Sequence, residues 1–186
     1  MRVDFRAYAS DSTIRGTVVL ASDRLTDLLS ETGDFEVEGA TLQALDDGRV
    51  VDMPSATIHR DDLCVIAATG LRGDSRRRSR TRQRPMRVRL GPYTIVGYLH
   101  SSPSADPVAS ALRRRIVPMT SASIEYELLG RRLEERHDGL LLVREKIEWL
   151  QSATDEEVGL ARGLELKIGI ESRAKDLTGA LTRQGW

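Results

Sequence analysis

Arginine is the residue type whose spacing in this 186-residue sequence offers the most chemistry. The 28 basic and 28 acidic residues balance, yet nine arginines and one aspartate fall between Gly70 and Pro92. Guanidinium groups bind phosphates, and each neutralised phosphate releases counterions, so such binding weakens steeply with salt. The functional interpretation of this run is contact with nucleic acid or another anion, through the following side chains: Arg76, Arg77, Arg78, Arg80, Arg82, Arg84 and Arg87.

The same run has a structural interpretation as a solvated linker between two acidic parts of the chain. It contributes +8 to a chain whose net charge is +0, so the remaining residues carry −8. Ser75, Ser79 and Thr81 separate the arginines, and the run has no aromatic ring on which single-stranded bases could stack. A third interpretation folds the run back onto the acidic parts, and all three stay open on the sequence alone.

Other residue types that often carry chemistry lack the required spacing. His59, His100 and His137 are far apart and form no close pair of the kind that zinc ligands show. Asp46-Asp47 lies in a turn sequence, where aspartate hydrogen-bonds locally, and this disfavours a role as general acid or base. The sequence has no nucleophile elbow and no glycine loop that opens a helix. We therefore predict that the protein is not an enzyme and uses no metal, no cofactor and no small-molecule substrate.

The cysteine and hydropathy content predicts a cytoplasmic protein. Cys64 is the one cysteine, so the chain can form no internal disulfide, as expected in a reducing compartment. No stretch approaches the ~18 apolar residues of a membrane-spanning helix. The first ten residues also lack the apolar centre of a signal peptide.

The elements that must position these residues come in two similar sets. Three pairs of segments match in the same order, at offsets of 81, 82 and 84: Ile14-Arg15-Gly16 with Ile95-Val96-Gly97, Ala40-Thr41-Leu42 with Ala122-Ser123-Ile124, and Arg60-Asp61-Asp62-Leu63 with Arg144-Glu145-Lys146-Ile147. Such self-similarity indicates a duplicated module. We predict four segments: a first β module at 1–69, an Arg-rich linker at 70–92, a second β module at 93–152, and a C-terminal helix at 153–186.

Each module is expected to contain a first strand, a short helix and then three or four antiparallel strands. Asp106-Pro107 fits a helix N-cap followed by proline at the first helical position. Asp46-Asp47-Gly48 predicts a hairpin turn, because Asp-Gly supplies the positive φ that such turns need, and His137-Asp138-Gly139 predicts a further turn. Trp149 occupies the position that Val65 holds in the first module, so we expect its side chain in the core.

The residues after Ser152 predict an amphipathic helix. Thr154 and Glu157 form a capping box, in which each residue's side chain accepts a hydrogen bond from the other's backbone. Glycines at four positions weaken this helix, by up to about 1 kcal/mol each, so we expect it to dock on a module, on another copy or on a partner. Its predicted partner-binding residues are apolar: Leu160, Leu164, Ile168, Ile170, Leu177 and Leu181.

The second module carries a pattern that resembles a known family. Ile116 to Ala122, with Gly97 upstream and Val143 to Ile147 downstream, resembles an uncharacterised bacterial domain family with small Sm-like β-barrel character. The first module departs from this pattern, since Phe35 to Ala40 lacks its proline and threonine. The resemblance implies a mainly β (β-rich α+β) fold of two tandem small Sm-like barrels or rolls, each with a short helix after its first strand. It also implies ring formation and RNA binding, because Sm proteins do both.

These observations lead to two functional hypotheses of different classes. The first is a non-enzymatic interaction or scaffolding module that self-associates into a homo-oligomer or bridges protein partners. The alternative is an Sm-like nucleic-acid (RNA) binding protein that uses the Arg-rich tether. Recruitment to a membrane surface by the same charges is a third reading and ranks below both.

Overall fold

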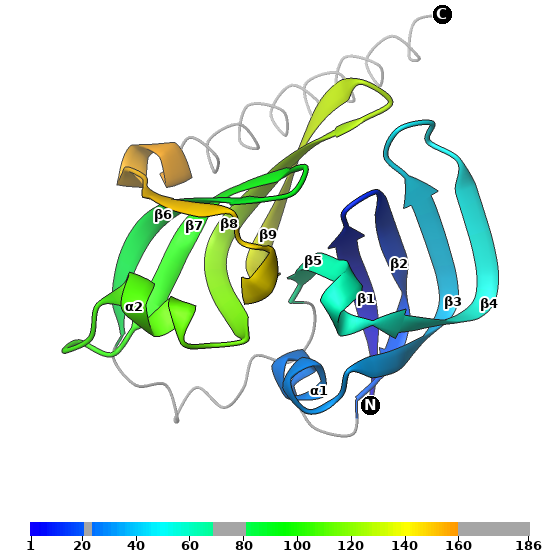
Figure 1. The fold of residues 1–186 in the computed structure, drawn as a ribbon, viewed down its shortest axis with the longest axis horizontal. Coiled ribbons are helices and arrows are strands. Elements are labelled where there is room, and N and C mark those ends of the chain that lie inside the picture. The colour runs from blue at the N-terminus through cyan, green and yellow to red at the C-terminus, as the bar shows by residue number, and fades with distance from the viewer. Residues whose placement is uncertain (21–23, 69–80, 160–186) are drawn as a thin grey trace, which may run out of the picture.

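Ten β-strands form one open, antiparallel sheet in the computed structural model, which describes residues 1–20, 24–68 and 81–159. The strands follow the order β10-β6-β7-β8-β9-β5-β1-β2-β3-β4. The mainly β prediction is confirmed. The expected tandem small Sm-like barrels or rolls are not confirmed, because the sheet is open and β5 pairs with β1 on one side and with β9 on the other. This shared ladder joins the two halves into a single sheet (Figure 1).

The elements of the first half are β1 (Arg2–Ala9), β2 (Ser12–Val19), α1 (Leu25–Glu31), β3 (Asp34–Ala44), β4 (Val50–His59) and β5 (Leu63–Ala67). Those of the second half are β6 (Arg82–Leu90), β7 (Tyr93–Ser101), α2 (Pro107–Leu112), β8 (Ile116–Leu128), β9 (Arg131–Val143) and β10 (Trp149–Ser152). Short 3-10 turns, Arg60–Asp62 and Arg144–Lys146, precede β5 and β10. In both halves the fifth strand pairs with the first, and the first four strands follow in sequence order.

Strand β6 occupies residues that the sequence analysis assigned to the Arg-rich linker, so that linker boundary is wrong. Met86, Val88 and Leu90 alternate along β6 and are all buried. Arg87 and Arg89 point to the other face of the sheet, where each makes a hydrogen bond. The arginine content concealed a strand because only one face of β6 needs to be apolar.

Strand β9 runs unbroken for 13 residues, through the turn that His137-Asp138-Gly139 was expected to make. The hairpin that begins β9 turns at Leu129 and Gly130, whose φ angles are 55° and 68°. Further along, β9 keeps one register with β8, with Thr120 opposite Gly139 and Ala122 opposite His137. Continuous pairing with β8 therefore holds these residues in an extended conformation, so no turn forms.

Two hydrophobic cores lie against opposite faces of the sheet where β5 and β9 meet. We name them the N-terminal core, which contains Phe5 and Val37, and the C-terminal core, which contains Val88 and Ile95. Alternate side chains of β5 and β9 enter different cores, because neighbouring residues of a strand face opposite ways. Val65, Ala67, Leu140 and Leu142 enter the C-terminal core, whereas Leu63, Ile66, Leu141 and Val143 enter the N-terminal core.

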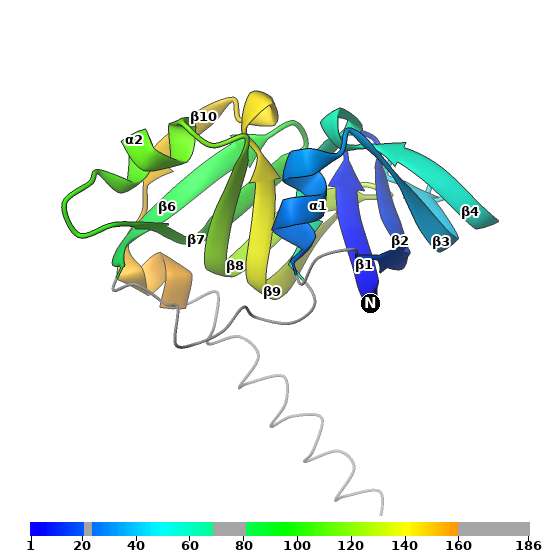
Figure 2. The same cartoon turned by 90° about the horizontal axis from the view of Figure 1, so that it is seen from below.

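The two short helices close these cores. Helix α1 buries Leu25 and Leu29 in the N-terminal core, beside Ile116 of the second half. Figure 2 shows α1 lying next to β9 and β1, over the line where the halves meet. Helix α2 begins at the predicted cap, where the carboxylate of Asp106 accepts hydrogen bonds from the backbone of Val108 and Ala109 at 2.8 and 2.9 Å.

Candidate interaction surface

The β5–β9 ladder is the inner junction between the two halves. It pairs Val65 with Leu142, Ile66 with Leu141, and Ala67 with Leu140. All six residues are at most 3% exposed. The ladder continues for one more step, where the backbone N–H of Ala68 donates to the carbonyl of Gly139 at 3.0 Å. Two edge strands that would otherwise be open are therefore closed by each other.

A polar cluster lies beside the inner junction, and we name it the junction cluster: Arg6, Tyr8, Tyr126, Glu135 and His137. The carboxylate of Glu135 accepts hydrogen bonds from the hydroxyls of Tyr8 and Tyr126 and from the guanidinium of Arg6. Tyr8 comes from the first half and Glu135 from the second, and their side-chain oxygens are 2.9 Å apart. The Tyr8 ring also packs edge-on against Tyr126, with ring centres 5.8 Å apart. One carboxylate therefore forms hydrogen bonds with residues of both halves.

The hydrogen-bond chemistry of the junction cluster determines where its protons lie. The Tyr8 hydroxyl gives its one proton to Glu135, since a carboxylate can only accept. Its oxygen must then accept from the Nε2 of His137, which is 2.8 Å away and therefore carries hydrogen. Burial lowers the pKa of His137, against the opposing effect of Glu135. Burial, followed by the hydrogen bond to Glu135, raises the pKa of Tyr126 to about 12.

Hairpin tips add a second set of contacts between the halves. The hydroxyl of Tyr93 donates to the carbonyl of Ala9 at 2.5 Å. The backbone N–H of Leu129 donates to the carbonyl of Leu45 at 2.9 Å. The Leu129 side chain covers Gly48, where an added Cβ would lie 2.8 Å from the nearest leucine carbon. The β8–β9 hairpin is thus docked on the β3–β4 turn.

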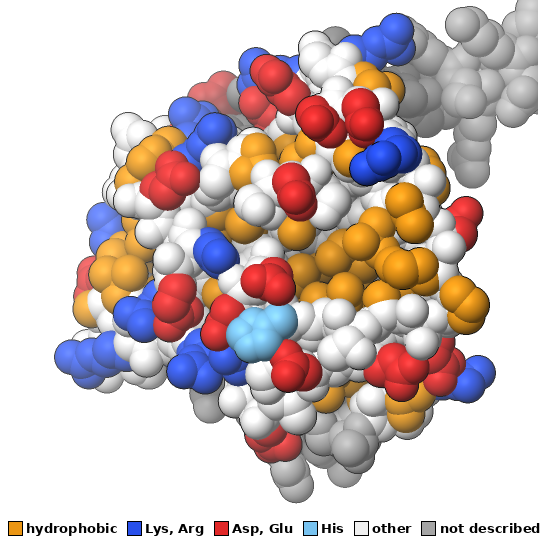
Figure 3. Space-filling model, turned by 45° about the vertical axis from the view of Figure 1, so that its right-hand side comes forward, with side chains coloured by type: hydrophobic (Ala, Val, Ile, Leu, Met, Phe, Trp, Pro, Cys, Tyr) orange, Lys and Arg blue, Asp and Glu red, His pale blue; other side chains and the backbone are white. Residues whose placement is uncertain are grey.

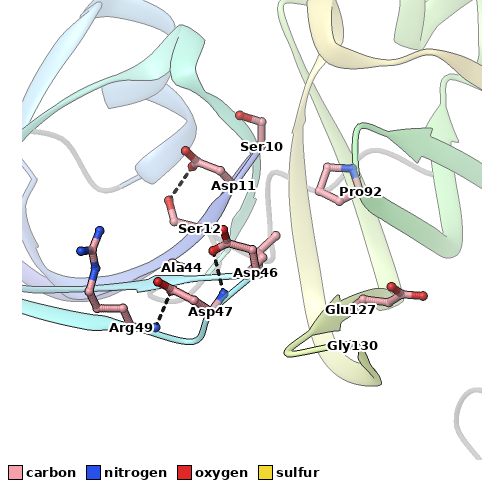
Figure 4. A pocket seen from close by; sticks show the side chains of 11 residues that line it. Ser10, Asp11, Ser12, Ala44, Asp46, Asp47, Arg49, Pro92, Glu127 and Gly130 are labelled. Atoms are coloured by element: carbon pink, nitrogen blue, oxygen red, sulfur yellow. Dashed lines mark hydrogen bonds between the residues drawn. The ribbon is translucent and has the colours of Figure 1, made fainter.

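A cleft of about 620 Å³ lies between these hairpins (Figure 4). Its lining includes the carboxylates of Asp11, Asp46, Asp47 and Glu127. Three of them accept local hydrogen bonds: Asp11 from the Ser12 hydroxyl, Asp46 from the backbone of Asp47, and Asp47 from the backbone of Arg49. These carboxylates stabilise turns, and within the described chain no three His, Cys, Asp or Glu side chains are grouped to hold a metal.

The two ends of the sheet, β4 and β10, each have a partner on one side among the described strands. Both carry exposed apolar side chains: Val50 is 51% exposed, Val51 is 44% exposed and Trp149 is 42% exposed. Figure 3, in which the β4 side of the molecule comes forward, shows hydrophobic side chains gathered in one continuous area. The expectation that Trp149 fills the core is therefore wrong. Its counterpart Val65 is covered by β9, whereas no described strand covers β10.

The predicted anion-binding arginines separate into two groups. Arg76, Arg77, Arg78 and Arg80 lie outside the described residues. The other three lie on β6, where Arg82 is exposed and the remaining two have partners within the chain. Arg84 donates to Asp106 and Ser152 at 3.3 Å, and Arg87 donates to Glu157 at 2.5 Å. Anion binding by the seven arginines together stays a prediction.

The start of the predicted C-terminal helix packs on the second half. Its capping box is confirmed: the Thr154 backbone donates to Glu157 at 2.7 Å, and the Glu157 backbone donates to the Thr154 hydroxyl at 3.2 Å. Val158 is fully buried, and the hydroxyl of Tyr98 donates to Asp155 at 2.9 Å. The predicted partner-binding residues all lie outside the described residues: Leu160, Leu164, Ile168, Ile170, Leu177 and Leu181.

Sequence reasoning missed the junction cluster. Tyr8 and Glu135 are 127 positions apart, and neither lies in a recognisable motif. One signal was available, because Glu135 and His137 are two residues apart and therefore face the same side of β9. Two neighbouring polar residues on the covered face of a strand need partners, and this requirement points to a buried polar contact.

Within the described residues, no helix is both long and apolar enough to cross a membrane. Comparisons of the chain with protein families, with curated proteins and with solved structures find no match.

Proposed function

We propose that the protein is a non-enzymatic interaction module that self-associates, and that it is built from two copies of one small Sm-like unit. The observation that carries this proposal is the pair of open strand edges, β4 and β10, with exposed apolar side chains on each. Inside the chain, the matching edges of the two halves close each other at the inner junction. The same surfaces recur at the two ends of the sheet, where no described strand covers them.

Residue pairings support the duplication. Phe5 lies opposite Gly16 in the first half, and Met86 lies opposite Gly97 in the second, so both partners differ by 81 positions. Farther along, Gly39 and Ser121, which differ by 82 positions, both take a positive φ and mark the same bulge. Copies of one unit explain why hydrogen-bond registers, and not only residue types, coincide.

Exposed edges of this kind support association, because an unpaired strand presents backbone donors and acceptors to any other strand. Monomeric proteins usually protect such edges with charged residues or proline. On β4, Asp52 and Pro54 are residues of this kind, yet Val50 and Val51 beside them remain exposed, as does Trp149 on β10. Self-association through these edges, or the bridging of protein partners through them, buries these apolar side chains and so accounts for their exposure in the single chain.

Sedimentation equilibrium of the full chain tests the proposal. We expect an average mass above that of one chain, rising with protein concentration and little affected by salt, since the edges are apolar. A chain that ends at Gly159 keeps the capping box and Val158, and its mass will show whether residues 160–186 take part in the association. A single-chain mass at every concentration overturns the proposal.

The nucleic-acid alternative remains a prediction that depends on Arg76, Arg77, Arg78 and Arg80. Titration of the same protein with a single-stranded RNA oligonucleotide at low salt tests it separately. Binding that weakens steeply as salt is added supports the alternative, and a flat titration at low salt removes it.

A further inference from the structure

We infer that β10 of one copy pairs antiparallel with β4 of the next copy, in the register that β5 and β9 use inside the chain. We name this contact the outer junction. The inference rests on the proposed self-association. It specifies which two strands meet, that they run antiparallel, and which residues lie opposite each other.

The equivalence of β5 and β10 follows from the strands they share a ladder with. Val65 lies opposite Tyr8 in the first half, and Trp149 lies opposite Arg89 in the second. The next pair along each ladder matches as well: Ile66 lies opposite Ala7 in the first half, and Leu150 lies opposite Val88 in the second. Trp149 is therefore the counterpart of Val65.

The equivalence of β9 and β4 follows in the same way from β3 and β8. Ile58 lies opposite Phe35, and Leu142 lies opposite Val117. Two positions earlier on these strands, Ala56 lies opposite Val37 as Leu140 lies opposite Met119. Ile58 and Ala56 are therefore the counterparts of Leu142 and Leu140.

Transferring the inner register to the sheet ends gives three residue pairs. Because Val65 pairs with Leu142, Trp149 pairs with Ile58 of the next copy. Because Ile66 pairs with Leu141, Leu150 pairs with Thr57 of the next copy. Because Ala67 pairs with Leu140, Gln151 pairs with Ala56 of the next copy. Trp149 then lies beside the N-terminal core of the next copy, as Val65 lies in the C-terminal core of its own chain.

The two segments are suited to this pairing. Neither Ser55 to Ile58 nor Trp149 to Ser152 contains a charged residue or a proline. Pro54, which cannot donate a ladder hydrogen bond, lies opposite the bulge at Gly39 and just outside the segment that must pair. It therefore limits the contact to a few residues, which is also the length that β10 offers.

The outer junction is heterologous, because it joins β10 of one molecule to β4 of another and leaves each molecule with one further free edge. Repetition of such a contact gives a closed ring if the rotation closes and a filament if it does not. A symmetric dimer in which β4 pairs with β4 is the competing arrangement, and the register distinguishes the two.

Disulfide cross-linking between two variants, each with one added cysteine, tests the inferred register. The Ala68–Gly139 hydrogen bond makes the neighbouring Ala67–Leu140 pair one without direct hydrogen bonds. Its counterpart, Gln151 with Ala56, therefore has Cα atoms about 4.5 Å apart, within the range of about 4.4–6.8 Å that disulfides bridge. Gln151 is exposed and Ala56 is half-buried, so Gln151→Cys and Ala56→Cys leave the core intact.

Equimolar full-length Gln151→Cys and Ala56→Cys chains are mixed and mildly oxidised. We expect a disulfide-linked dimer from the mixture and none from either variant alone. Gln151→Cys mixed with Thr57→Cys is the matched control, because Thr57 faces the other side of the sheet. Native Cys64 stays in all chains, since it is 2% exposed, and the unmodified protein gives the background.

The outcomes separate the inference from the proposed function. An assembled protein whose matched pair cross-links no better than the Thr57 control overturns the outer junction and leaves self-association intact. Cross-linking of Ala56→Cys with itself supports the β4–β4 dimer and also overturns the inference. A protein that sediments as a single chain overturns both.

Discussion

Replacement of Glu135 by alanine offers the sharpest test of how the two halves are held together. The substitution removes the acceptor for Tyr8, Tyr126 and Arg6 in one step. The side chain of Glu135 is 21% exposed and that of Arg6 is 25% exposed, so water can replace only part of what is lost.

The expected loss follows from these contacts. A buried hydrogen-bonding group left without its partner costs about 1–3 kcal/mol. Tyr126 loses its acceptor, Tyr8 retains His137, and Arg6 retains some contact with water. Taking about 1 kcal/mol for each of the three donors, we expect Glu135→Ala to lower the free energy of unfolding by about 3 kcal/mol.

Glu125 supplies the matched control, because it is also a glutamate paired with an arginine on the same sheet. Its partner Arg132 is 73% exposed, and exposed ion pairs contribute about 0–1 kcal/mol. Urea unfolding of both variants, followed by circular dichroism, gives the two free energies. If Glu135→Ala costs no more than Glu125→Ala, the junction cluster does not stabilise the contact between the halves.

Three further predictions concern pH, packing and assembly. Because burial keeps the pKa of His137 below 6.5, stability should fall as pH drops below 6.5, where the unfolded chain takes up the proton first, and His137→Gln should reduce that slope in urea melts at pH 5 to 7. Gly97→Ala places a Cβ 2.8 Å from a side chain of β8, so it should cost about 1–3 kcal/mol in the same assay, whereas Gly159→Ala, with open space around it, should cost far less. Trp149→Thr keeps strand propensity but removes an aromatic ring that is 42% exposed. Burying 42% of about 200 Å² at about 25 cal/mol per Å² is worth about 2 kcal/mol. The substitution should therefore weaken assembly about 30-fold by sedimentation, and Leu112→Ala, exposed on α2, should leave it unchanged.

Local features of the fold were largely predictable. The expected modules of antiparallel strands agree with a mainly β chain, and the caps at Asp106 and at Thr154 with Glu157 are confirmed by their hydrogen bonds. The turn at Gly48 has the expected positive φ of 68°. These features depend on a few neighbouring residues, whose preferences act before any distant contact forms.

Errors arose where a strand's surroundings decided the outcome. Arg82–Leu90 was assigned to a linker because of its arginines, although a strand needs one apolar face only. Trp149 was expected in the core because Val65 is buried, but burial of Val65 depends on β9 lying beside β5.

The order of residues alone determined the helix caps, the turn at Gly48 and the matching offsets between the halves. Only the tertiary structure decided which strand edges meet, and so which are left open. The physical reason is that edges pair through backbone N–H and C=O groups, which every residue except proline offers alike. The side-chain pattern does not specify a partner for β5 or β10, and the contact of Tyr8 with Glu135 exists only once β9 lies against β5.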